Sequence, residues 1–196
     1  YNPEVAKWSP FHGGISAVVE SLAKVVAMGG DFRKTRLSFQ EYFERLGDDP
    51  EKWGRPFAAL LGAFEAQQAL GIPAIGGKES MSGTFEDLTV PPTIISFAVT
   101  AGRVDRIVTG ELKKPGHKLY LCGIARDDKG LVDYDSVARM LDGVHEMTKS
   151  ARVVAAKAVG QKGVMEALAK MAMGNKVGIR LSDGLDEAFL FSPNCG

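Results

Sequence analysis

The sequence predicts a mixed α/β protein built from two units. Three observations support this: several stretches carry apolar residues at helical spacing, a near-continuous apolar run reads as a buried strand, and a polar segment rich in Lys and Arg divides the chain. We expect an N-terminal unit over residues 1–103, a linker over 104–117 and an incomplete α/β unit over 118–196.

Helices dominate the first unit. Apolar residues recur every three or four positions over residues 12–28, and two glycines follow as a stop. Residues 56–70 repeat the pattern, with a proline in the first turn and Gly71 just past the end. The aromatic and charged stretch between them, residues 39–53, predicts a shorter helix followed by a loop at 47–50.

Strands are expected on both sides of the linker. Residues 72–75 predict a short strand that leads into a glycine-rich loop. Residues 93–101 form an apolar run typical of a strand covered on both faces, and residues 118–125 resemble the first buried strand of the second unit. The other elements expected there are helices over 134–147, 151–159 and 163–173, a strand over 177–181 and the start of a helix over 186–191.

Composition excludes several classes of function. The chain has 24 basic and 24 acidic residues and a pI near 7.0, which argues against a dedicated nucleic-acid binder. Its apolar runs are too short to span a bilayer, so no membrane partner is expected. The two cysteines, Cys122 and Cys195, form no motif and predict a reducing, cytoplasmic setting.

Residues 75–85 carry the clearest chemical signal. They contain three glycines, one lysine, one carboxylate and three hydroxyls. Glycines allow backbone N–H groups to converge on an anion, and Lys78 adds a positive charge. The segment is not a Walker A loop, because Lys78 is followed by Glu79 rather than by Ser or Thr. By composition, a phosphate-handling loop and a plain glycine-rich turn both remain open.

Glu20 and Lys24 lie four residues apart on the first predicted helix. The simpler interpretation is a surface ion pair that contributes a few tenths of a kcal/mol, roughly 0.3. The functional alternative is a metal or phosphate contact beside the glycine segment. The chain also begins at Tyr1 and stops directly after an apolar segment, so we expect it to be a piece of a longer protein.

The string Pro-Ala-Ile-Gly-Gly-Lys-Glu-Ser-Met-Ser-Gly-Thr-Phe, residues 73–85, resembles a segment of phosphoribosylformylglycinamidine synthase, a purine-biosynthesis ligase that uses ATP and glutamine. Residues 37–44, 53–63, 86–93 and 171–179 resemble its long, single-chain form. That family has two pseudo-symmetric halves, each like aminoimidazole ribonucleotide synthetase. The resemblance therefore implies part of the second half: an N-terminal half-barrel domain followed by a truncated α/β C-terminal domain.

The resemblance also implies roles for single residues. In relatives the residue matching Gly77 contacts ATP, Lys78 replaces a residue near the metal and phosphates, and the position of Ser80 binds formylglycinamide ribonucleotide. No catalytic residue is expected within the chain. The segment would thus divide into ATP or phosphate contacts at Gly76, Gly77, Lys78 and Glu79 and substrate contacts at Ser80 and Ser82.

Some positions depart from the family pattern. Glu79 stands where the family has Asp. Glu20 matches a glutamate that holds Mg²⁺ at a second, structural nucleotide site, but Lys24 replaces an Asn ligand there, and Gln161-Lys162 replaces an Asp-Gly pair. A lysine ammonium has no acceptor for Mg²⁺. We therefore expect this structural site to be weakened or absent, with Glu20 as its one remaining metal ligand.

The function implied is part of an ATP-dependent carbon–nitrogen ligase. With ATP and Mg²⁺ it would convert formylglycinamide ribonucleotide to formylglycinamidine ribonucleotide, using ammonia from glutamine. Its expected partners are the first synthetase half and the glutaminase domain of the same polypeptide. Alone, the chain should be inactive and should self-associate through an exposed apolar sheet. Two other hypotheses are a non-catalytic scaffold half and a stand-alone dimeric nucleotide-binding module.

Overall fold

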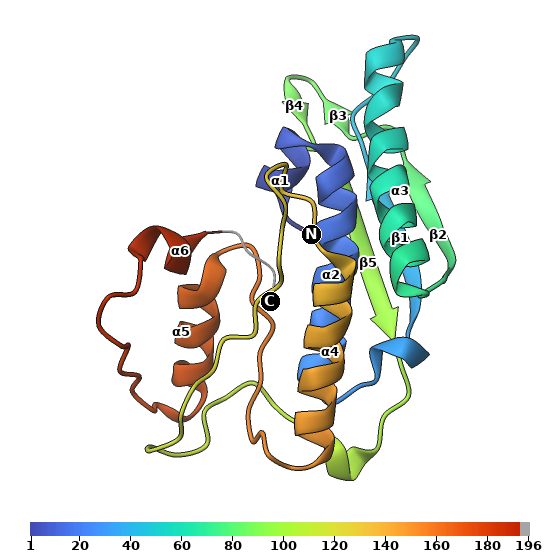
Figure 1. The fold of residues 1–196 in the computed structure, drawn as a ribbon. Helices are drawn as coiled ribbons and strands as arrows, with labels where there is room; N and C mark the ends of the chain where they lie inside the picture. Colours follow the sequence, from blue (N-terminus) through green and yellow to red (C-terminus); the bar gives the residue numbers. More distant parts are fainter. Residues whose placement is uncertain (193–196) are drawn as a thin grey trace.

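A three-stranded mixed sheet lies toward one side of the computed structural model, which describes residues 1–192 (Figure 1). Strand β1 (Arg36–Tyr42) is the middle strand. It pairs in parallel with β2 (Ala74–Ser80) and antiparallel with β5 (Thr93–Val99). A separate ribbon pairs β3 (Thr84–Phe85) with β4 (Leu88–Thr89). The sheet therefore has two edge strands, β2 and β5.

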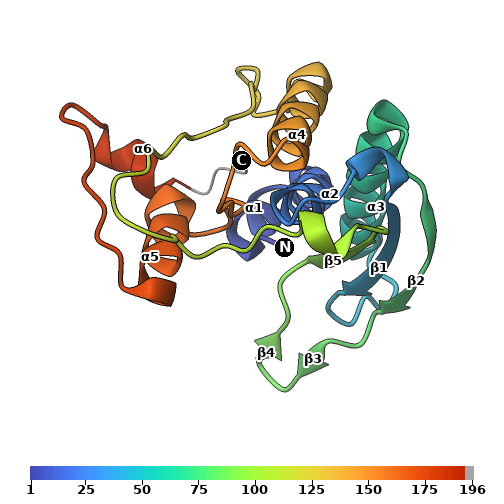
Figure 2. The ribbon, with the colours of Figure 1, turned by 90° about the horizontal axis from the view of Figure 1, so that it is seen from below.

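Helices cover one face of this sheet. α2 (Pro10–Ala27) and α3 (Pro50–Leu70) pack side by side on it, and α4 (Tyr134–Lys149) lies against α2 on the side away from β5 (Figure 2). α5 (Gly163–Asn175) and α6 (Glu187–Phe191) pack together at one side of the molecule. The remaining elements are α1 (Pro3–Trp8) and two 3₁₀ turns, Phe32–Lys34 and Val104–Arg106.

Local sequence sets the bounds of the two central helices. The Ser9 side chain caps the start of α2, and Asp49 caps the start of α3. A proline follows each cap in the first turn, where its missing N–H costs nothing. Gly71 ends α3 in the left-handed conformation that glycine adopts freely. Pro56 is accommodated inside α3, which starts six residues earlier than predicted.

The main core lies between the sheet and the helices. It joins Leu37 and Phe39 of β1 to the buried face of α2, and it also includes Val137 and Leu141 of α4. A second, smaller cluster forms around α5 and α6 from Val159, Val164, Ala167 and Leu190. Helix α4 thus shares a core with the first predicted unit. The domain boundaries at 103 and 118 stay a prediction.

The helices predicted over residues 12–28, 56–70, 134–147, 163–173 and 186–191 are confirmed, but several other predicted elements are wrong. Residues 39–53 contain no short helix, because β1 occupies 36–42 and alternates buried and exposed side chains. The prediction of a glycine-rich loop is also wrong for residues 76–80, because they are part of β2. Strand β5 is covered on one face only: Phe97 and Val99 are 47% and 69% exposed.

The second half contains less regular structure than predicted. Residues 118–125 and 177–181 form no strand, and residues 151–159 form no helix. An apolar run becomes a strand only where another backbone pairs with it. Near 118–125 the described residues offer just one isolated bridge, between Arg126 and Val132.

No helix within residues 1–192 is long and apolar enough to cross a membrane. Cys122 is half-buried, and Cys195 lies outside the described residues.

Candidate functional site

The glycine segment forms the exposed edge of the sheet. A bulge separates the Leu37–Ala74 pair from the Phe39–Gly77 pair, and Gly76 lies within it at φ 156°. Gly77 has a structural reason to be glycine, because a Cβ there would lie 2.6 Å from the carbonyl oxygen of Phe39. On the outer side of an edge strand, every second N–H has no neighbouring strand to bond. The segment thus offers backbone donors to a ligand as a strand, not as a loop.

The pleat of β2 separates the predicted site residues onto two faces. Successive side chains of a strand point to opposite sides of a sheet, so Lys78 and Ser80 share one face and Glu79 lies on the other. The register pairs Lys78 with Gln40 and Ser80 with Tyr42. Because β1 buries its other residues against the helices, this pairing places Lys78 and Ser80 on the open face.

Polar groups continue along the open face beside Lys78. The hydroxyl oxygens of Ser80 and Ser82 lie 3.4 Å apart. The Tyr42 hydroxyl donates a 3.0 Å hydrogen bond to the side-chain oxygen of Gln40. These side chains and the lysine form a row of one cation and several neutral donors, which is suited to binding an anion.

On the helix-covered side of the sheet, Glu79 pairs in register with Glu41. Glu41 is only 3% exposed, and one of its carboxylate oxygens is buried without a hydrogen-bond partner. Burial, and then the neighbouring charge of Glu79, raise the pKa of Glu41 to about 7. Two carboxylates from adjacent strands therefore share one face, away from Lys78.

Glu20 lies in a different environment on α2. One carboxylate oxygen is 2.6 Å from the Lys24 ammonium and the other is 3.0 Å from the amino group of Tyr1. Burial acts to raise the pKa of Glu20, but the Lys24 hydrogen bond and the amino terminus together lower it. Gly160 lies beside this carboxylate, since a Cβ there would be 3.5 Å from its oxygen. The described contacts of Glu20 do not include the glycine segment.

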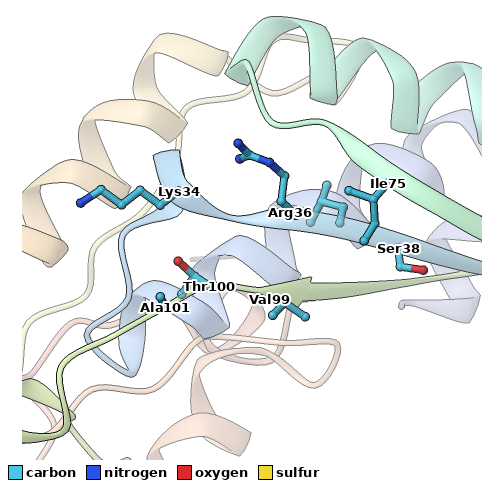
Figure 3. Close-up of a pocket in the computed structure, with 8 residues that line it drawn as sticks. Lys34, Arg36, Ser38, Ile75, Val99, Thr100 and Ala101 are labelled. Carbon is cyan, nitrogen blue, oxygen red and sulfur yellow. The ribbon is translucent and has the colours of Figure 1, made fainter.

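A shallow depression lies at the other end of the open face (Figure 3). Ile75 and Val99 form its apolar part, and Lys34 and Arg36 supply two cations. The Arg36 guanidinium donates to the carbonyl of Thr35. The full lining is Lys34, Arg36, Leu37, Ser38, Ile75, Val99, Thr100 and Ala101.

Sequence reasoning missed Gln40, Glu41 and Tyr42 as neighbours of the glycine segment. Alternation over residues 36–42 was the available signal, because it is the pattern of a half-buried strand. In this alternation Glu41 occupies a buried position, where a carboxylate is unexpected. Among the described residues, no group of three or more His, Cys, Asp or Glu side chains is placed to hold a metal ion.

The fold combines a small mixed sheet, helices on one face and a glycine-containing edge strand. No family model matches the chain. The phosphoribosylformylglycinamidine synthase subunit PurL of Pyrobaculum aerophilum is 27% identical to it, over 90% of this chain and 27% of that relative.

Solved structures share this fold. Thermotoga maritima PurL complexed with ATP has a TM-score of 0.66 at 19% identity, over 97% of this chain and 33% of that one. The same PurL has also been solved complexed with FGAR. The hydrogenase maturation protein HypE has a TM-score of 0.56 at 17% identity, over 93% of this chain and 64% of its own. The chain is therefore a distant homologue of PurL, and it spans about a quarter of the length of the curated relatives that it matches.

Proposed function

We propose that this chain contributes a phosphate-binding wall to the active site of an ATP-dependent carbon–nitrogen ligase of the PurL type. The observation that carries the proposal is the row of Lys78, Ser80 and Ser82 on an exposed sheet edge, in a distant PurL homologue. The reaction would join ammonia from glutamine to formylglycinamide ribonucleotide. The glutaminase domain and the other synthetase half would lie elsewhere in the same polypeptide.

The open face supplies charge and donors for anionic ligands. Lys78 provides a point charge for phosphate oxygens, and Ser80 and Ser82 provide neutral donors two residues apart. Phosphoryl transfer is catalysed largely by positioning and charge neutralisation, so such a row contributes without doing covalent chemistry. ATP, when bound, supplies the phosphoryl group that activates the substrate amide oxygen.

A metal at Glu20 does not fit the residues present. One of its oxygens lies 2.6 Å from the Lys24 ammonium, and an ammonium cannot be a Mg²⁺ ligand. We therefore place no Mg²⁺ at Glu20 and propose that the structural nucleotide site of the family is weakened or lost in this chain.

Kinetics of the complete enzyme test the proposal. Lys78→Ala and Ser80→Ala should each lower kcat/KM by about tenfold or more, because each removes a contact to a developing or transferred charge. Lys149→Ala, which removes an exposed lysine on α4, is the matched control and should change kcat/KM by less than twofold. Unchanged turnover in both site variants would instead favour the non-catalytic scaffold.

The exposed apolar side of the sheet favours a second role, docking. Phe97 and Val99 lie on the open face together with the polar row. In the ligase this face would meet the first synthetase half. Calorimetry of the isolated chain with ATP and Mg²⁺ distinguishes a stand-alone nucleotide-binding module from one half of a larger ligase. One-to-one binding supports the stand-alone module, and no heat of binding supports a half that needs the rest of the ligase.

A further inference from the structure

The paired carboxylates of Glu41 and Glu79 have no counter-charge in the described structure. Residues 1–192 contain no ion pair to either of them within 4.0 Å, the limit for such a pair. Lys52 and Arg55, the cations that follow β1 most closely on α3, are both engaged by Glu44. An unpaired buried carboxylate is costly, and a second negative charge beside it adds to that cost.

The strand pleat prevents the adjacent lysine from neutralising the pair. Lys78 pairs with Gln40 on the open face, whereas Glu79 pairs with Glu41 on the helix-covered side. The two carboxylates are close enough for the charge of Glu79 to act on Glu41. Glu41 therefore has a buried carboxylate oxygen without a hydrogen-bond partner, Glu79 is its neighbour in register, and within residues 1–192 no cationic side chain lies within 4.0 Å of either carboxylate.

We propose that Glu41 and Glu79 together bind one divalent cation, Mg²⁺ or Mn²⁺, at the edge of the sheet. Carboxylate oxygens are the hard ligands that these ions prefer, and Mg²⁺ typically takes one or two carboxylates and keeps several waters. Glu79 is exposed, so water completes the coordination from the solvent side.

The cation would link two neighbouring strands. β1 and β2 are held together by their ladder, and a metal bridge between Glu41 and Glu79 would secure the end where β2 leaves the sheet at Ser80. It would lie on the opposite side of the sheet from Lys78. The proposal is thus independent of nucleotide and substrate, and it stands or falls separately from the ligase function.

Titration of the 196-residue chain with Mn²⁺, followed by the electron paramagnetic resonance signal of the free ion, tests this site. We expect one saturable Mn²⁺ per chain, displaced by excess Mg²⁺. Glu41→Gln and Glu79→Gln should each weaken binding about tenfold or more, because each removes a charged ligand. Glu146→Gln, an exposed carboxylate on α4, should leave binding unchanged.

Since Glu79 is exposed, Glu79→Gln keeps the test valid if Glu41→Gln fails to fold. No saturable Mn²⁺ binding at millimolar concentration would overturn the proposal and indicate a proton shared by the two carboxylates. Binding that survives both substitutions but is lost in Glu20→Gln would also overturn it, because the ion would then lie on α2.

Discussion

Glu41 shows how one buried carboxylate couples the sheet to pH. Its folded-state pKa of about 7 lies above the ordinary value of 4.5, so the folded chain holds a proton that the unfolded chain has lost. The contribution of this raised pKa to the free energy of unfolding is fully present below about pH 4.5 and is lost as the pH rises through 7. Glu79 is open to water, which screens its charge. We therefore expect Glu41 to contribute about 1–3 kcal/mol to the free energy of unfolding.

Urea denaturation in buffer with EDTA checks this prediction. Between pH 5 and pH 8 the free energy of unfolding of the wild type should fall by about 1–3 kcal/mol more than that of Glu41→Gln, because glutamine cannot ionise. Glu146→Gln should follow the wild type. Parallel pH profiles for the wild type and Glu41→Gln would show that the carboxyl titrates normally.

Between elements, glycines allow α2 and α3 to pack closely. A Cβ at Gly14 would lie 2.1 Å from the carbonyl oxygen of Ala59, and one at Gly62 would lie 2.0 Å from that of Phe11. Both contacts are with backbone, which cannot rotate away. The helices must therefore separate or shift to accept any side chain at these positions.

Gly62→Ala should destabilise the chain by about 1–3 kcal/mol, the usual cost of overpacking a tight contact. Gly54→Ala is the control on the same helix: nothing lies within 4 Å of its added methyl group. This control should be neutral or stabilise by up to about 1 kcal/mol through helix propensity. Thermal or urea unfolding of the two variants measures the difference, and equal effects would contradict the packing argument.

Sequence alone predicted the helices well and the strands poorly, and the reason is physical. Helix period and a glycine at the end are local signals, so α2, α4, α5 and the end of α3 are predicted near their true bounds. The start of α3 is predicted six residues late, because Pro56 lies inside the helix and Pro50 is the proline of its first turn. A strand depends on a distant partner. Residues 118–125 are apolar but lack one in the described chain, whereas 36–42 have two partners despite charged and aromatic residues.

The candidate site was only partly predictable for the same reason. Residues 75–85 predict an anion-binding segment, because its glycines, lysine and hydroxyls lie together in the sequence. The separation of Lys78 from Glu79 follows from the pleat of β2. The approach of Glu41 to Glu79 follows from strand register, which joins segments far apart in the chain. Register is set by tertiary packing, so no local pattern specified it.

At the scale of the whole molecule, one side of the sheet has no helix of residues 1–192 over it. Phe97 and Val99 of β5 and Ile75 beside β1 leave apolar surface open to solvent. α3 carries a second exposed apolar stripe on its outer surface, which includes Phe57. Large apolar patches usually mark surfaces that another protein covers. A sheet face offers a broad, flat surface for this, whereas the α3 stripe is one helix wide.

We expect the isolated chain to associate through the open sheet face. Val99→Lys should shift the chain toward monomer, because a lysine there would have to be desolvated in the contact. Phe57→Lys on α3 is the matched control, since both residues are 69% exposed in the monomer, and it should leave association unchanged. Light scattering across a dilution series measures the effect. A wild-type monomer at all concentrations would rule out association, and loss of association only in Phe57→Lys would move the contact to α3.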